Sequence, residues 1–253
     1  MRLKANISRN VSILRRKASK DARIALNREK RYAREFRKIL ASQMVEFGKT
    51  KKLSGDLSDV INGLYDKELP YWLTNEYKML DTSTVKAKGD EFFLPGWSKW
   101  VKDFKKTKVA KRIVLVNDTT KEIVSFVIKD GADRGLEFAI ISENILKKAK
   151  SIETYNRAMT IARTEMGNAI NHAKERSSKD FEAETGRELG KLWIHRGSNE
   201  PRISHIEADT GIPIPKDVPF IVDGEQMMYP HDSGASAGNT INCNCQVVYT
   251  RLN

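Results

Sequence analysis

The sequence predicts an α+β protein whose N-terminal two-thirds is mostly helical and whose C-terminal end is a small mixed α+β domain. Two observations support this fold class. Residues 1–47 contain no Gly or Pro and are rich in strong helix formers, so we expect a long helix there. After Gly186, short β-branched segments alternate with Pro and Gly turns, which is the pattern of short strands.

The long predicted helix, residues 8–47, carries a narrow apolar stripe. Apolar side chains recur at every seventh position along it: Val11, Ala18, Ala25, Tyr32 and Ile39. Asp21 and Arg28 interrupt the companion row that a regular coiled coil would fill. We therefore expect this helix to pack against other helices of the chain.

Further helices are expected before residue 186. Asp56 or Ser58 would cap a short helix ending near residue 65, and Pro70 would start another. Residues 81–98 read as an irregular connection whose aromatic side chains lie in the core. The series Thr119-Thr120-Lys121-Glu122 reads as a capping box before a helix. Helices over residues 136–146 and from residue 152 past residue 173 follow.

The remaining residues predict the small domain. We expect strands at residues 191–195, 212–214, 219–222, 226–229 and 245–249, and a turn or short helix at residues 203–208. The predicted domains are a basic helical region, residues 1–105, and a second domain, residues 106–253. The second domain contains helices over residues 106–186 and the α+β module over residues 187–253.

Positive charge is concentrated at the N-terminus. The 253-residue chain has a net charge of +12, but residues 1–52 hold seventeen Lys or Arg against four acids, a local excess of +13. A basic helix face neutralises phosphates and releases counterions, which gives sequence-independent, salt-sensitive binding to nucleic acid. The alternatives are a helix whose charges are only solvated and a helix that docks on an acidic protein. The candidate DNA-binding residues are Arg9, Arg15, Arg16, Lys17, Lys20, Arg23, Arg28, Lys30, Arg31, Arg34, Arg37 and Lys38.

The composition excludes two classes of protein. No apolar run approaches the length of a membrane span. The two cysteines, Cys243 and Cys245, are separated by one residue, so they do not form the framework of a disulfide-rich secreted domain.

The same cysteines are candidate metal ligands. Two thiolates and His205 would supply three ligands to a zinc ion, with His195 or Asp209 as the fourth. The alternative is that the cysteines pack as small apolar side chains and the histidines form hydrogen bonds.

An ordered series of motifs spans about 90 residues of the C-terminal half. Its pieces are IARTE at 161–165, NA at 168–169, KLW at 191–193, RISH at 202–205, DTG at 209–211, Phe220, MYPHD at 228–232 and INCNC at 241–245. In order and spacing this series resembles the phage Mu protein F-like family of head morphogenesis, or minor head, proteins. The chain departs from the family pattern at Asn244, commonly Arg, and at Thr210, usually Gly.

The resemblance implies a structural protein of a tailed phage or prophage. Such a protein lies inside the virion capsid near the portal, after assembly in the host cytoplasm, and acts in head assembly or in DNA packaging or delivery. Its expected partners are the portal protein, capsid or scaffold proteins and double-stranded DNA, with no membrane and no enzymatic activity. The matched residues Arg163, Glu165, Arg202, Ser204 and Asp209 would form a structural network, with Asp209 orienting His205.

An enzyme is the alternative from a different class. In a metal-dependent or His/Cys-dependent nuclease or toxin-like protein, His205 would act as general base and Cys243 as nucleophile, and the basic helix would capture the substrate. A plain DNA-binding protein would explain the helix but not the motif series.

Overall fold

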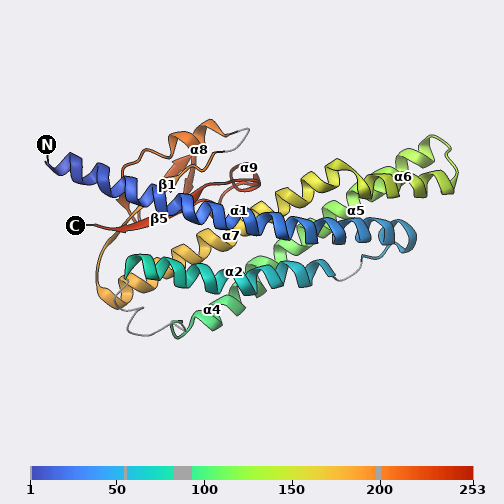
Figure 1. Ribbon diagram of the computed structural model, residues 1–253. Helices are drawn as coiled ribbons and strands as arrows, with labels where there is room; N and C mark the ends of the chain where they lie inside the picture. The colour runs from blue at the N-terminus through green and yellow to red at the C-terminus, as the bar shows by residue number, and fades with distance from the viewer. Residues whose placement is uncertain (1, 54–55, 82–92, 198–200, 253) are drawn as a thin grey trace. The chain divides into compact units, whose positions relative to one another are not determined.

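The computed structural model describes residues 2–53, 56–81, 93–197 and 201–252, and for residues 2–10 and 56 only the backbone. It is mostly helical with a few antiparallel strands near the C-terminus (Figure 1), which confirms the predicted fold class. None of the helices in these ranges is apolar over a stretch sufficient to span a bilayer.

The chain forms two compact units. Unit 1 comprises Met1–Arg28, Lys67–Trp97 and Arg163–Asn253, and unit 2 comprises Glu29–Asp66 and Ser98–Ala162. This division differs from the linear boundary expected after residue 105. The reason is that three long helices each contribute residues to both units.

The helices before the C-terminal strands are long and nearly consecutive. The predicted N-terminal helix is a single element that extends beyond the expected bounds. In chain order the elements are α1 (Arg2–Thr50), α2 (Asp56–Leu80), α4 (Trp97–Phe104), a π-helical turn (Lys105–Val109), α5 (Ala110–Asp133), α6 (Phe138–Lys150) and α7 (Ile152–Thr185).

Pro70 lies inside α2, so the prediction that it begins a new helix is wrong. A proline in a helix removes one backbone hydrogen bond. The neighbouring side chains of Leu69, Trp72 and Leu73 are fully buried. Their packing outweighs the local cost of the proline, since tertiary burial supplies most of the stability of a helix in a protein.

The predicted capping box is also interior to a helix. The hydroxyls of Thr119 and Thr120 donate hydrogen bonds of 2.9 Å to the carbonyls of Leu115 and Val116, one turn earlier in α5. A threonine inside a helix can make this bond to the carbonyl four residues earlier instead of capping a helix. The prediction that a helix starts at these residues is therefore wrong.

Part of the predicted connection at residues 81–98 lies outside the described residues, including Phe92. Of its described aromatics, Trp97 is fully buried, as expected for a core residue, and its indole nitrogen donates to Asp180 at 2.7 Å. Phe93 packs edge-on against Trp97 but remains exposed.

Unit 1 contains the strands and two short helices. Strand β1 (Leu189–Ile194) lies between β2 (Ile214–Pro215) and β5 (Gln246–Arg251) in an antiparallel sheet, with Leu189 opposite Arg251 and Ile194 opposite Gln246. A separate hairpin pairs β3 (Phe220–Val222) with β4 (Glu225–Met227). The short helices are α8 (Ile203–Glu207) and α9 (Ala237–Thr240).

A buried ion pair joins the helices of unit 1. The ammonium of Lys174 on α7 lies 3.0 Å from the Asp21 carboxylate on α1 and 3.8 Å from that of Glu76 on α2. Lys174 also donates to the backbone carbonyl of Val247 on β5 at 3.4 Å. Asp21, which interrupts the companion row of the apolar stripe in the sequence, lies on the buried face of α1 because Lys174 is buried with it.

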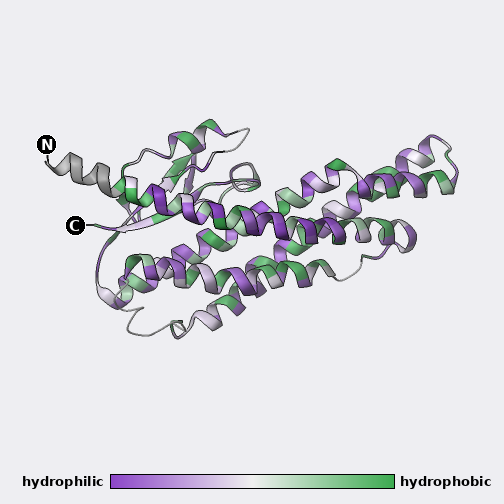
Figure 2. Ribbon diagram, viewed as in Figure 1, coloured by the Kyte–Doolittle hydropathy of each residue, from purple (hydrophilic) through white to green (hydrophobic). Residues whose placement is uncertain are grey.

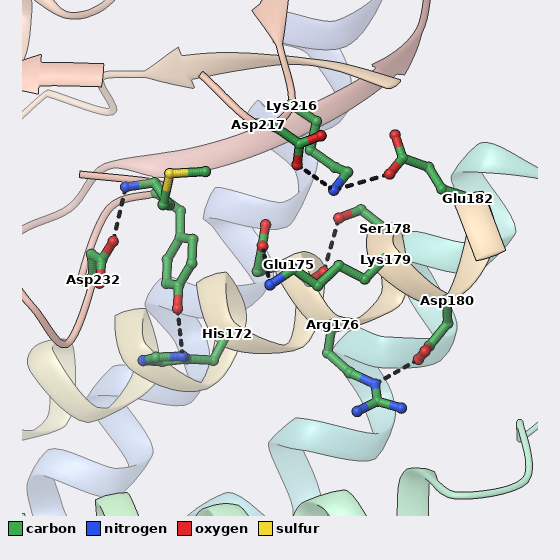
Figure 3. Close-up of polar contacts among 12 residues, drawn as sticks. His172, Glu175, Arg176, Ser178, Lys179, Asp180, Glu182, Lys216, Asp217 and Asp232 are labelled. Carbon is green, nitrogen blue, oxygen red and sulfur yellow. Dashed lines mark hydrogen bonds and ion pairs between the residues drawn. The ribbon is translucent and has the colours of Figure 1, made fainter. Parts of the chain in front are cut away.

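Polar contacts also fasten α7 to the C-terminal segments, as Figure 3 shows. The Tyr229 hydroxyl and the His172 ring nitrogen lie 3.2 Å apart. Farther along the helix, Glu182 pairs with Lys216 at 2.9 Å. The Tyr249 hydroxyl of β5 donates to Glu175. Three residues of α7 therefore hold three different parts of the small domain.

Unit 2 is built around an apolar cluster. Its buried members come from α1, α5 and α6: Met44, Val124, Ile141, Ile145 and Ala149. Gly131 lets α5 and α6 approach closely, because a Cβ at this position would lie 2.6 Å from Ile141. Arg157 of α7 donates to the carbonyl of Val116 at 2.8 Å, which ties α7 to α5.

The buried carboxylate of Glu76 predicts a pH dependence of stability. Burial raises its pKa to about 7, against the opposing effect of Lys174 and with a further increase from Asp21. The folded protein therefore holds this proton more tightly than the unfolded chain, so its contribution to stability is full below about pH 4.5 and is lost as the pH rises through about 7. The loss amounts to about 3 kcal/mol. In Glu76→Gln this loss is absent.

Urea unfolding of wild type and Glu76→Gln between these pH values measures the effect. We expect the stability of the variant to rise relative to wild type with increasing pH. Glu143→Gln, at an exposed residue paired with Lys147, is the control and should show a constant difference. A constant difference for Glu76→Gln as well would contradict the prediction.

Candidate functional site

Three potential metal ligands meet in unit 1. His205 of α8, Cys243 and Cys245 have ligand atoms that all lie within 4.8 Å of one another. The His205 Nδ1 atom is 3.5 Å from each of the two sulfurs. All three side chains are 2–3% exposed. The structure therefore brings together the Cys-x-Cys pair and the histidine that the sequence predicted as ligands.

Asn239 of α9 orients the histidine ring. Its Oδ1 lies 3.2 Å from His205 Nε2, and its Nδ2 donates to the carbonyl of Val222 at 3.3 Å. The second bond fixes the amide so that its oxygen faces the ring. Nε2 then carries the proton, and Nδ1 presents its lone pair to the sulfurs, which is the tautomer that a metal ligand requires.

Asn239 was not predicted from the sequence. It lies among small residues in α9, and its type and position carry no signal of a role beside His205. The expectation that Asp209 orients His205 is wrong. Its carboxylate accepts two hydrogen bonds from Arg15, at 3.1 and 2.6 Å, and one from the His195 backbone nitrogen at 3.0 Å.

The two thiols are chemically different. The Cys245 backbone nitrogen donates to Cys243 Sγ at 3.3 Å. A hydrogen bond from the Cys245 thiol lowers the pKa of Cys243 against the opposing effect of burial, and the same bond to Cys243, together with burial, raises the pKa of Cys245. Cys243 is therefore the sulfur that loses its proton first.

This donor set fits a metal ion. Two thiolates and one imidazole are the ligands that soft and borderline metals prefer, and the carboxamide of Asn239 supports the imidazole as outer-shell partners do in such sites. The ring of Trp193 packs edge-on against His205 with centroids 5.4 Å apart, which closes the site to solvent. His205, Cys243 and Cys245 could thus bind a metal ion.

The structure does not supply the predicted fourth ligand. Within the described part of the chain, the candidate metal group has three members, and neither His195 nor Asp209 belongs to it. His195 is partly exposed, and its Nδ1 accepts a hydrogen bond from the Gly197 nitrogen at 3.4 Å. Asp209 is instead paired with Arg15, and the backbone nitrogen of His195 donates to the same carboxylate.

Motif residues of α7 and α8 hold the cysteine loop. Arg163 donates to the Asn242 side chain at 2.6 Å, and the Thr164 hydroxyl accepts from the Asn242 nitrogen at 3.0 Å. Arg202 donates to the carbonyl of Ile241 at 2.8 Å. Arg163 therefore has a partner outside its own helix. Two other network candidates are Glu165, which is buried, and Ser204, which is half-buried.

His231 braces the same loop from the other side. Its Nε2 lies 3.0 Å from the Cys243 carbonyl oxygen. The ring rests on Gly167 of α7, where a Cβ would lie 2.2 Å from Nε2. Only glycine at position 167 leaves room for this ring, so the glycine is part of the support of the site.

The predicted DNA-binding residues fall into two groups. Arg15 is paired with Asp209, and Arg28 is bound to Glu68 at 2.5 Å and lies 3.9 Å above the Tyr71 ring, so both have structural roles within unit 1. Lys17 is half-buried, and the side chain of Arg9 lies outside the described residues.

The other candidates are on the solvent-exposed face of α1, which is largely hydrophilic in Figure 2. In unit 1 these are Arg16, Lys20 and Arg23, and in unit 2 they are Lys30, Arg31, Arg34, Arg37 and Lys38.

Comparison of the chain with protein-family models, curated proteins and solved structures finds no match. The resemblance to the Mu F-like family therefore rests on the motif residues alone.

The geometry predicts that the protein binds about one metal ion per chain. His205→Ala and Cys243→Ser should lose the metal, and Asn239→Ala should weaken its binding roughly 10–100-fold because the imidazole loses its support. Elemental analysis of protein purified without a histidine tag measures the content. His195→Ala is the control and should retain full occupancy. Metal-free wild-type protein would contradict the prediction.

Proposed function

We propose that this chain is a minor head protein of a tailed phage or prophage, located inside the capsid near the portal. In this role it acts in head assembly or in DNA packaging or delivery, and it contacts DNA without sequence preference. The portal protein, capsid or scaffold proteins and double-stranded DNA are its partners. The motif series of the C-terminal half supports the family, and the surface of α1 supports the contact with DNA.

The observation that carries the DNA contact is the exposed face of α1. Besides Arg15, which is paired with Asp209, eight of the predicted basic residues are exposed on α1, whereas Glu35 is the one exposed acid among the described α1 side chains. Asp21 and Glu29 are buried and do not offset the surface charge. Such a face attracts phosphates at low ionic strength and loses affinity as salt rises.

The metal centre has a structural role in this proposal, and the metal is zinc. Zinc is bound by Cys and His in small domains that lack a large core. Here it would join α8 to the segment before β5 and so hold the compact module together. The same module then presents a fixed surface to the portal or capsid.

One arrangement favours an enzyme as the second candidate. Cys243, His205 and Asn239 form a hydrogen-bonded chain like that of an activated thiol nucleophile. Each of these side chains is 2–3% exposed, so a phosphodiester cannot reach the sulfur in this conformation. The structural role is therefore the one that the geometry favours.

Charge reversal tests the DNA contact without removing α1, whose other face is part of the core. The triple variant is Arg16→Glu/Lys20→Glu/Arg23→Glu. It should bind duplex DNA roughly a hundredfold or more weakly at low salt, because three phosphate contacts are lost. The slope of log Kd against log salt concentration should fall by about 3. Fluorescence anisotropy measures both. Lys102→Glu/Lys106→Glu/Lys129→Glu, at exposed lysines of unit 2, matches the change in charge and should have a much smaller effect.

Two observations test the head-protein assignment itself. The chain should sediment with purified phage heads, and a portal gene should lie immediately upstream of its own. Incubation with DNA or RNA should give no cleavage. Cleavage that is abolished in His205→Ala or by a chelator would support the enzyme in place of the head protein.

A further inference from the structure

A hollow in unit 2 gathers basic side chains from two helices. It has a volume of about 550 Å³ and lies between the middle of α1 and the last turn of α6. Its lining consists of Arg31, Arg34, Glu35, Arg37, Lys38 and Ala41 from α1, and Ala149 and Lys150 from α6. We call this hollow the basic groove.

The basic groove is strongly cationic. Five of its eight lining residues are Lys or Arg, and Glu35 is the single acid. Arg34, Lys38 and Lys150 are exposed and have no ion-pair or hydrogen-bond partner among the described residues. Arg37 lies 5.5 Å from the centre of the Tyr155 ring, which restrains its side chain. The positive charges of the groove therefore lie close together, with one acid in the lining to neutralise them.

The groove also has a shape that admits an anion between its charges. Ala41 and Ala149 contribute short side chains, so the longer basic side chains rise around them. Arg34 and Lys38 are one helical turn apart, which is about 6 Å along α1. Lys150 comes from the other helix. A phosphate seated here is approached by cations from both sides, unlike one resting on a single helix face.

We infer that the basic groove binds the phosphodiester backbone of a nucleic acid, and this inference rests on the DNA contact in the proposed function. An acidic protein is the competing ligand class. Charged residues are depleted in the centres of protein–protein interfaces, whereas interfaces with nucleic acid are strongly positive. A lining in which most residues are cations matches the second class. The inference adds Lys150, which lies outside the basic N-terminal segment, to the nucleic-acid contact.

The test uses the full chain with two variants of equal charge. Arg34→Glu/Lys150→Glu changes the groove, and Lys106→Glu/Lys129→Glu makes the same change in charge elsewhere in unit 2. Binding to a short DNA duplex and to the corresponding single strand is followed by fluorescence anisotropy over a range of KCl. Circular dichroism and thermal unfolding check that both variants fold. Lys150→Gln serves as a milder second variant of the groove.

We expect the groove variant to bind DNA roughly tenfold or more weakly than the control variant at low salt. The slope of its log Kd against log salt concentration should be lower by about 2. Lys150→Gln should lower it by about 1. Equal binding by the groove and control variants would overturn the groove while leaving the DNA contact of α1 intact. Failure of the wild-type chain to bind either form of DNA would overturn both.

Two competitors identify the ligand class. Poly-glutamate is the first competitor. If it displaces labelled DNA as effectively as unlabelled DNA does, and if the groove variant no longer binds it, the groove is assigned to an acidic protein. Inorganic phosphate that displaces DNA at equal phosphate concentration would assign it to a free anion. Displacement by unlabelled DNA alone supports the phosphodiester backbone.

Discussion

The buried ammonium of Lys174 determines much of the arrangement of unit 1. A lone charge in a protein interior is costly, so its partners must be brought to it, and they come from α1 and α2 as carboxylates and from β5 as a carbonyl. Because Asp21 has to face this ammonium, the rotation of α1 about its own axis is fixed. The residues on the opposite side, including Arg16, Lys20 and Arg23, are then directed to solvent. The interior pairing therefore selects the basic face that the protein presents.

The same helix, α7, also positions the candidate metal ligands. Asn171, one turn before Lys174, accepts a hydrogen bond from the Val247 nitrogen at 2.9 Å and donates to the Cys245 carbonyl at 3.3 Å. Arg163 and Thr164 hold the turn at Asn242, so the segment that contains both cysteines is fixed to α7 at each end. Backbone and side-chain hydrogen bonds thus position the candidate ligands in advance, which would lower the entropic cost of binding a metal ion.

Local patterns in the sequence predicted the elements whose signals are local. The long helix, the late strands and the ligand trio His205, Cys243 and Cys245 follow from periodicity, turn residues and spacing. The errors at Pro70 and Thr119 arose because a helix embedded in tertiary packing tolerates residues that end an isolated one. The partners of Asp209 and His205 could not be predicted, since they depend on which of several polar residues the fold places nearby. Arg15 and Asn239, the residues found there, are far from them in the chain.

The division of the chain into interleaved units has a consequence for its synthesis. All segments of unit 2 precede residue 163, so they are synthesised before the C-terminal part of α7 and the strands. Unit 1 needs α1, its middle segment and β5 together, and β5 follows every segment of unit 2 in the chain. Leu14 and Ala18, which pack against Leu192 and Val248, are therefore covered only after β5 has been made. A nascent chain of this protein therefore keeps these apolar side chains uncovered from the synthesis of α1 until that of β5.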